Sequence, residues 1–316
     1  MTLIKKTRHA IAWRWPILKE ILSSWFAVLQ YKILSTLPAS QKNHSLPREL
    51  IVSLTSYPKR FKTLYMTLDC LRKQTVKPDR IILWIAYEDM AAIPEKIKQM
   101  KEIDIRADRD TRSYMKIIPT LQAYPEAFIV TADDDIYYPS KWLQTLLEAW
   151  DGDNRQIVCH RAHAIKWDEN GNLMPYAQWD QEITGGHLST EIFPTGVGGV
   201  LYPPGALSPE VTDIETFTTL CPKADDVWLY WMGRRAGAIY KKTAMDYKIP
   251  AWPDSQASAL FHENWLQGGN DRQIEALIER YGWPGEEKAK PAPSQLSDLK
   301  ALPAEPSTEA KSRRTG

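Results

Sequence analysis

Short apolar runs alternate with segments of helical spacing through the first half of this 316-residue chain. Four runs have the length of a strand: 50–55, 80–85, 103–106 and 127–132. Helical spacing or helix-start signals mark the segments between and after them: 61–71, the residues after Pro94, 113–124 with a break at Pro119, and 142–150. Strands that alternate with helices in this way predict an α/β fold, a parallel sheet with helices on both faces.

The second half of the chain has a different pattern. Two apolar segments, 156–167 and 172–179, flank the turn residues 168–171 (DENG), which predicts a β-hairpin. Further on, residues 224–237 have the composition of a helix that ends near Gly237.

Composition divides the chain into three parts. Residues 1–46 are basic, and their apolar stretch 11–34 is interrupted by charges, so no uncharged span reaches the ~18–20 residues of a transmembrane helix. Tryptophans, leucines and basic residues there predict an amphipathic helix that lies on a membrane surface or packs on the domain or another subunit; both alternatives stay open. Residues 47–283 are the predicted folded domain, and 284–316, rich in Pro, Ala, Lys, Glu and Ser, are expected to be disordered.

Charge and cysteine content narrow the class of protein. The formal net charge of +1 argues against nucleic acid or another polyanion as the main partner. The three cysteines, Cys70, Cys159 and Cys221, are far apart and form no CxxC pair. They predict neither a disulfide framework nor a cysteine zinc site, and a reducing compartment is expected.

Three carboxylates, Asp133, Asp134 and Asp135, directly follow the apolar run 127–132. Neighbouring carboxylates repel one another, and removing them from water at the end of a core strand is costly. A divalent cation would replace the repulsion with attraction, and hard oxygen ligands suit Mg²⁺ or Mn²⁺, whose open positions a diphosphate can fill. The alternative is an acidic surface turn that caps a helix before Pro139.

Four segments, in this order, resemble GT-A fold glycosyltransferases, most closely the family-two-like enzymes of bacterial polysaccharide assembly. They are IVSLTSYPKR (51–60), TADDDIYYP (131–139), PTGVGGVLYPPG (194–205) and ADDVWLYW (224–231), and the likeness covers about residues 50–275. The resemblance implies a mixed, Rossmann-like sheet that binds a nucleotide sugar, with the acceptor in the later half. It also implies inverting, metal-dependent transfer from a donor, expected to be UDP-linked, to a hydroxyl of a glycan or lipid-linked acceptor.

The resemblance assigns the metal ligands as well. Asp133 and Asp135 would hold Mn²⁺ or Mg²⁺, and Asp134 would face the sugar or ribose of the donor. His262, in the segment LFHENW, is a further candidate ligand, with a packed or surface histidine as the alternative. The ion would neutralise the departing diphosphate as a Lewis acid.

Other residues are assigned to the nucleotide sugar: Thr55, Ser56, Tyr57, Arg60, Glu88, Arg112, Lys116, Gly198 and Gly199. The loop of residues 55–60 would contact base and ribose, and its arginine would reach a phosphate, unless the loop merely begins a helix. Glu88, with Asp89, follows the second strand, where a carboxylate of the family meets uracil or ribose. Arg112 and Lys116 would share a helix face and point at the diphosphate or into solvent. The two glycines would let the backbone approach the sugar.

Asp225 and Asp226 begin the predicted helix of residues 224–237. The helix dipole stabilises acidic groups at this end, so capping is one interpretation. The resemblance instead makes Asp226 the base that takes the proton of the acceptor hydroxyl, with Asp225 orienting the acceptor. The family often has Glu-Asp where this chain has Asp-Asp.

Two other functions stay open. A nucleotidyl- or phosphotransferase would need a glycine-rich phosphate loop, and TSYPKR contains no glycine. A catalytically silent binding protein would use residues 1–46 for peripheral contact with a membrane. The transferase hypothesis shares that contact and places the chain in the cytoplasm, at the inner face of the membrane.

Overall fold

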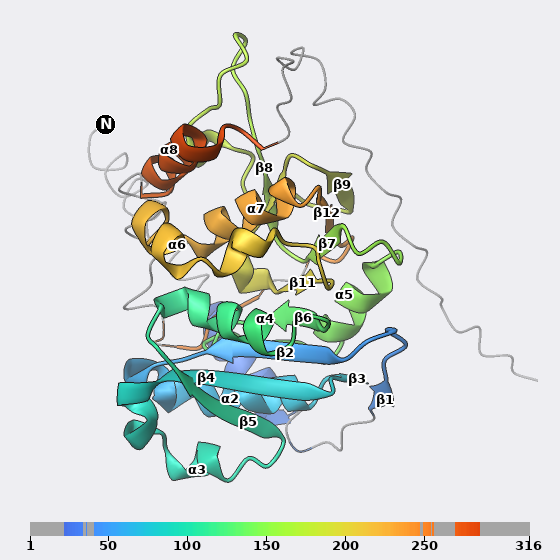
Figure 1. The fold of residues 1–316 in the computed structure, drawn as a ribbon. Coiled ribbons are helices and arrows are strands. Elements are labelled where there is room, and N and C mark those ends of the chain that lie inside the picture. The colour runs from blue at the N-terminus through green and yellow to red at the C-terminus, as the bar shows by residue number, and fades with distance from the viewer. Residues whose placement is uncertain are drawn as a thin grey trace, which may run out of the picture.

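A computed structural model describes residues 22–33, 36, 41–246, 249–253, 255 and 269–284. Its centre is an eight-stranded sheet with the order β5-β4-β2-β6-β11-β7-β12-β9 (Figure 1). The strands are β2 (Leu50–Thr55), β4 (Arg80–Ala86), β5 (Ile103–Asp108), β6 (Phe128–Thr131), β7 (Gln156–Cys159), β9 (His187–Ser189), β11 (Val200–Tyr202) and β12 (Ile239–Lys242). Two short ladders complete the described strands: β1 (Lys42–Asn43) with β3 (Val76–Lys77), and β8 (Ala162–Ala164) with β10 (Ile192–Pro194).

The sheet is mixed. Strands β5, β4, β2 and β6 are parallel, β11 runs antiparallel to both β6 and β7, and β12 is parallel to β7 and antiparallel to β9. Six strands therefore point the same way, and their carboxyl ends lie at one edge of the sheet.

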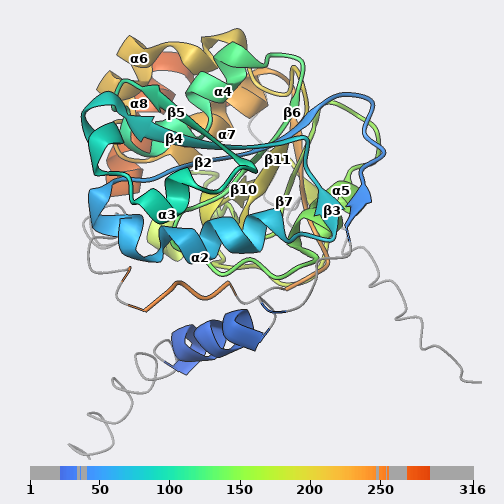
Figure 2. The same cartoon turned by 90° about the horizontal axis from the view of Figure 1, so that it is seen from below.

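Helices cover both faces of the sheet, which confirms the predicted α/β class (Figure 2). One face packs on α2 (Phe61–Arg72), α3 (Glu95–Lys98) and α5 (Trp142–Ala149). The other packs on α4 (Ile118–Ala123), α6 (Ile214–Leu220), α7 (Asp225–Arg235) and α8 (Gly269–Tyr281). Short 3₁₀ helices lie in the connections: η1 (Pro58–Arg60), η2 (Tyr87–Ala92), η3 (Arg112–Lys116), η4 (Tyr176–Gln178), η5 (Gly196–Gly198) and η6 (Pro209–Thr212).

Because both faces of the sheet are buried, the sequences of its parallel strands are continuous apolar runs. In β2, Leu50, Val52 and Leu54 join the core beneath α2, while Ile51 packs with Trp84 on the opposite face. All five apolar side chains are fully buried or nearly so. A strand covered on both sides needs no polar face, so alternation disappears from its sequence.

The break in segment 113–124 falls earlier than Pro119. The segment forms η3 and then α4, with the interruption at Ile117, and Pro119 occupies the first turn of α4. Proline is tolerated there because the first backbone N–H groups of a helix have no intrahelical partner.

The predicted hairpin is wrong for most of its length. One antiparallel bridge, Trp167 to Leu173, closes the turn, but residues 172–179 form no strand and include η4. The strand β7 pairs instead with β11 and β12, and β8 pairs with β10. The turn residues 168–171 correctly predicted that the chain reverses direction there. The strand β7, however, is better buried between strands distant in sequence than beside residues 172–179.

A helix also forms at residues 22–33, within the predicted amphipathic extension. No helix in the described ranges is both long enough and apolar enough to span a membrane. The fully buried Ala27 joins the core beneath α2, so this helix packs on the domain.

We expect Trp142→Ala to lower the free energy of unfolding by about 3–5 kcal/mol, because it empties a large buried site. Trp142 is fully buried, its ring lies 4.4 Å from that of Tyr138, and its Nε1 donates to the carbonyl of Gly198 at 2.7 Å. Urea denaturation followed by circular dichroism measures the loss. Tyr87→Ala, at a side chain that is 64% exposed, is the control and should change stability by less than about 0.5 kcal/mol.

Candidate functional site

The candidate site lies at the carboxyl edge of the sheet, between β2 and β6. The chain leaves β2 for β4 and β5 on one side and returns to β6 on the other. Connections that diverge in this way leave a crevice beyond the strand ends, where open α/β sheets bind ligands. The loops after β2 and β6 both begin at this edge of the sheet. Six of the predicted site residues lie in them: Ser56, Tyr57, Arg60, Asp133, Asp134 and Asp135.

A side-chain hydrogen bond and ion pairs connect the two loops. Ser56 Oγ donates to Asp134 Oδ2 at 2.5 Å, and Arg60 forms an ion pair with Asp135. Arg60 also lies 3.6 Å from Asp134, and all three charged side chains are largely buried. Burial and the neighbouring Asp135 carboxylate raise the pKa of Asp134 to about 7, although Ser56 and Arg60 act in the opposite direction.

Lys116 connects the acidic loop to the start of α7. Its Nζ lies 3.1 Å from Asp133 Oδ1 and 3.0 Å from Asp225 Oδ2. Burial alone would lower the pKa of Lys116, but the carboxylates of Asp133, Asp225 and Asp226 raise it well above its ordinary value. The ammonium group therefore stays charged and holds carboxylates from two distant parts of the chain together.

Asp226 completes this cluster. Its Oδ1 accepts a hydrogen bond from the backbone N–H of Gly196 at 3.0 Å. Burial and the adjacent Asp225 carboxylate raise the pKa of Asp226 to about 7, with Lys116 and the Gly196 bond opposing them. A carboxylate with a pKa near neutrality is well matched to general-base catalysis, because it is both available and basic at physiological pH.

Gly196 allows the approach of these side chains. A Cβ atom at this position would lie 2.8 Å from Lys116 Nζ and 2.9 Å from Asp226 Oδ1, closer than packed atoms tolerate. Gly196 is not among the predicted donor-binding residues. The signal for it is its place in the PTGVGG segment, two residues before Gly198 and three before Gly199.

Gly198 and Gly199, which were assigned to the donor, contact other residues. A Cβ on Gly198 would meet Arg161, and one on Gly199 would lie 2.4 Å from the ring of Trp142. Gly199 also has a φ of +89°, which favours glycine. The contacts of these two glycines are with a core tryptophan and an arginine, whereas Gly196 contacts the acidic cluster.

The remaining donor candidates differ in their exposure and in their partners. Thr55 donates to the carbonyl of Trp84 at 3.0 Å, Tyr57 is 36% exposed, and Glu88 is exposed in η2, with Asp89 beside it. The expectation that Arg112 shares a helix face with Lys116 is wrong. The two residues are the ends of η3, and Arg112 is exposed with a φ of 59° while Lys116 is buried.

The fit to a metal ion is incomplete. Within the part of the chain that the structure describes, no three Asp, Glu, His or Cys side chains form a set that could hold a metal. Asp135 is already paired with Arg60, and Asp133 with Lys116. His262 lies outside the described residues. The carboxylates as arranged thus have protein cations as counterions, and the gathered donor set that a divalent ion needs does not form.

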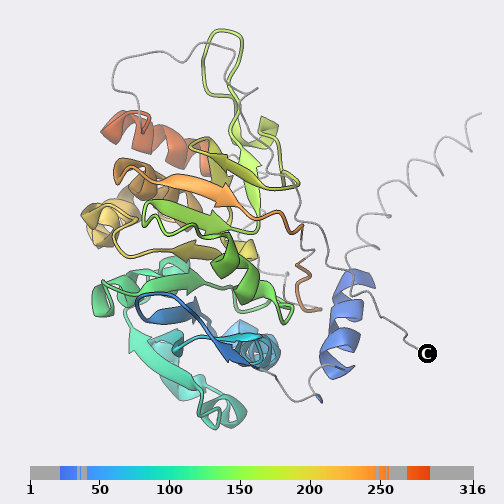
Figure 3. The ribbon, with the colours of Figure 1, turned by 90° about the vertical axis from the view of Figure 1, so that its right-hand side faces the viewer.

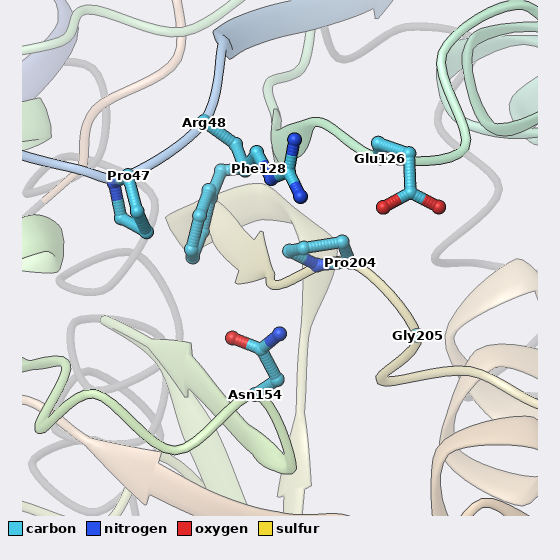
Figure 4. A pocket seen from close by; sticks show the side chains of 7 residues that line it. All are labelled: Pro47, Arg48, Glu126, Phe128, Asn154, Pro204 and Gly205. Carbon is cyan, nitrogen blue, oxygen red and sulfur yellow. The ribbon is translucent and has the colours of Figure 1, made fainter.

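A separate cavity of about 230 Å³ lies at the opposite edge of the sheet (Figure 4). It is lined by Pro47, Arg48, Glu126, Phe128, Asn154, Pro204 and Gly205. Arg48 precedes β2 and Phe128 begins β6, so the cavity is at the amino ends of the strands that carry the acidic cluster at their carboxyl ends. None of the candidate site residues lines it.

We expect Lys116→Met to destabilise the fold by about 3–5 kcal/mol, because it leaves buried carboxylates without their cation. Burial already raises the pKa of Asp226, and without the ammonium group that pKa rises further. A raised pKa in the folded state means that stability is lost as pH increases and Asp226 loses its proton, so the deficit should be larger at pH 8 than at pH 5. Urea denaturation at both pH values measures it. The control is Lys62→Met, at an exposed position of α2; an equal deficit at both pH values would contradict the expectation.

No protein-family model matches the chain, and no curated protein matches its sequence. Among solved structures, it is similar to a crystal structure of GalNAc-T7 with UDP, GalNAc and Mn²⁺, with a TM-score of 0.43 and 10% identity over 75% of this chain. The match spans about half of that protein, 51% of its chain. The chain is also similar to a 4-diphosphocytidyl-2C-methyl-D-erythritol synthase, with a TM-score of 0.34 and 15% identity over 55% of this chain and 86% of that one. Neither likeness bears on the chemistry of this chain, which we infer from its own side chains.

Proposed function

We propose that the chain is an inverting glycosyltransferase that moves a sugar from a nucleotide sugar, expected to be UDP-linked, to a hydroxyl of a glycan or lipid-linked acceptor. One observation carries the proposal. Lys116 joins Asp133, from the loop assigned to the donor, to Asp225, from the pair assigned to the acceptor. Two segments that were assigned opposite roles in one reaction thus meet at one buried ammonium group.

The proposed chemistry follows from the positions of the charges. Asp226 accepts the proton of the acceptor hydroxyl as that oxygen forms a bond to the anomeric carbon. The bond from that carbon to the diphosphate breaks on the opposite side, so a single displacement inverts the configuration. Asp225 is paired with Lys116, whereas Asp226 accepts the backbone N–H of Gly196 through Oδ1, so we assign the proton to Asp226.

We propose that two cations of the protein, Arg60 and Lys116, bind the diphosphate of the donor. Arg60 and Lys116 both lie at the carboxyl edge of β2 and β6, and the buried Nε of Arg60 has no hydrogen-bond acceptor among the described residues. A phosphate oxygen would satisfy it, and guanidinium groups bind phosphates through paired N–H donors. Ser56 and Asp134 lie beside Arg60 and are proposed to contact the ribose or sugar.

Metal dependence is a separate part of the proposal. Asp133, whose side chain is 29% exposed, is the most accessible carboxylate of the triad, and we propose it as the first ligand of Mn²⁺ or Mg²⁺. Asp135 could join it only by leaving Arg60. A bound ion would supply further positive charge at the departing diphosphate.

We expect Asp226→Asn to lower kcat by about 10²–10⁴-fold with donor binding unchanged, because the amide cannot accept the proton. Donor hydrolysis or transfer to an acceptor measures the rate. In the wild-type protein, kcat/KM should fall about tenfold per pH unit below a pH of about 7, since protonated Asp226 is inactive.

Asp213→Asn is the matched control for Asp226→Asn. Asp213 caps the start of α6, where its side chain accepts the N–H of Thr216, and asparagine caps a helix equally well. If Asp226→Asn retained full turnover with its fold intact, the assignment of Asp226 as the base would be wrong. If neither the wild type nor the variant turned over any nucleotide sugar, a silent binding protein would be favoured.

Nucleotide sugars should raise the melting temperature of the protein, because a ligand that binds the native state stabilises it. We expect UDP-sugars to raise the melting temperature, and Arg60→Met to make this rise smaller. Lys59→Met, at the exposed neighbouring position, should leave the rise unchanged. Repeating the measurement with Mn²⁺ and with EDTA tests the metal separately. A shift with EDTA equal to that with Mn²⁺ would argue against a metal cofactor, and no shift with any nucleotide sugar would argue against the proposed function.

A further inference from the structure

The helix of residues 22–33 exposes a continuous apolar stripe. Five large side chains are more than half exposed: Leu22 (61%), Trp25 (61%), Phe26 (58%), Leu29 (53%) and Ile33 (58%). Their spacing of three and four residues places them on one side of the helix. Scattered exposed apolar residues need no explanation, but a contiguous stripe that includes two aromatic side chains indicates a binding surface.

The opposite side of the same helix is already packed on the domain. Ala27 is fully buried, Val28 and Tyr31 pack against the core, and the Tyr31 ring meets Trp252 edge-on at 5.7 Å. Figures 2 and 3 show this helix, in blue, alongside α2 and the segment of residues 249–253. The helix thus already uses one side for the domain, and its apolar stripe faces away from it.

Size and charge distinguish between the possible occupants of the stripe. A stable interface with a second copy or another protein usually takes about 20–30 residues from each side, and five side chains are far fewer. The helix carries one charged residue, Lys32, and no acidic residue. Residues 1–35 contain six Lys and Arg residues against one Glu. Apolar and aromatic side chains beside a basic segment match the surface of an anionic bilayer.

We propose that the exposed face of the helix of residues 22–33 is a docking surface for anionic lipid. The apolar stripe inserts at the boundary between headgroups and acyl chains, while basic residues remain among the phosphates. The domain then rests on the bilayer through Ala27, Val28 and Tyr31, which join the helix to the core. This inference does not depend on the proposed glycosyl transfer.

The contacts of Trp252 relate this surface to the acidic loop. The backbone N–H of Trp252 donates to the carbonyl of Asp135 at 2.8 Å, and its Nε1 donates to Thr67 Oγ1 at 2.8 Å. Thr67 in turn donates to the carbonyl of Asp134 at 2.9 Å. The residue on which the docking helix packs therefore also holds the backbone of the loop after β6. Docking would fix the carboxyl edge of the sheet relative to the lipid surface.

The test is sedimentation of the full chain with vesicles. We expect binding to vesicles that contain phosphatidylglycerol, weak binding to pure phosphatidylcholine, and a loss of binding at high salt. Replacing both aromatic residues, Trp25→Ser with Phe26→Ser, should weaken binding roughly a hundredfold, since each ring contributes a factor of about ten or more. Both side chains are mostly exposed, so circular dichroism and the melting temperature should not change.

The matched control is Tyr87→Ser, which removes an aromatic side chain that is 64% exposed in η2, away from the helix. It should bind vesicles like the wild type. The proposal is overturned if the double variant binds as tightly as the wild type, or if neither vesicle binds the wild type. It is also overturned if sedimentation velocity shows that the wild type is a dimer and the double variant a monomer, because the stripe would then bind a second copy.

Discussion

The candidate site depends on one buried ammonium group. Lys116 stands between Asp133, at the end of a core strand, and Asp225, at the start of α7, with Asp226 nearby. Each of these charges would be costly to bury alone, and their mutual attraction is what makes the arrangement tolerable. Because the partners come from three separate elements, the ion pairs form only when the sheet and α7 are packed together. Formation of the site is thus coupled to formation of the fold.

The acidic loop after β6 is held from several sides. Ser56 and Arg60 bind the side chains of Asp134 and Asp135, while Thr67 and Trp252 bind the carbonyls of the same two residues. Side chains fixed by independent partners lose little further freedom when a ligand arrives. The loop therefore combines high charge with a defined conformation, which electrostatic stabilisation of a reacting group requires.

Predictions from local residue patterns are confirmed where neighbouring residues alone decide the structure. The strands β2, β4 and β6 and the helices α2, α5 and α7 lie where apolar runs and helical spacing predicted them. Prediction failed where partners are distant. Residues 172–179 form no strand because β7 pairs with β11 and β12, and Arg112 and Lys116 separate because η3 is a short 3₁₀ turn that buries one end.

The sequence by itself determined the α/β class, the position of the carboxylates at a strand end and the acidic start of α7. These follow from periodicity, strand length and helix-end preferences, which are properties of neighbouring residues. Only the tertiary structure decided that cations of the protein neutralise the triad, that Gly196 rather than Gly198 or Gly199 faces the cluster, and that the helix of residues 22–33 uses both its sides. The physical reason is that charge pairing and close packing depend on distances between side chains, and these are set when elements far apart in the chain come together.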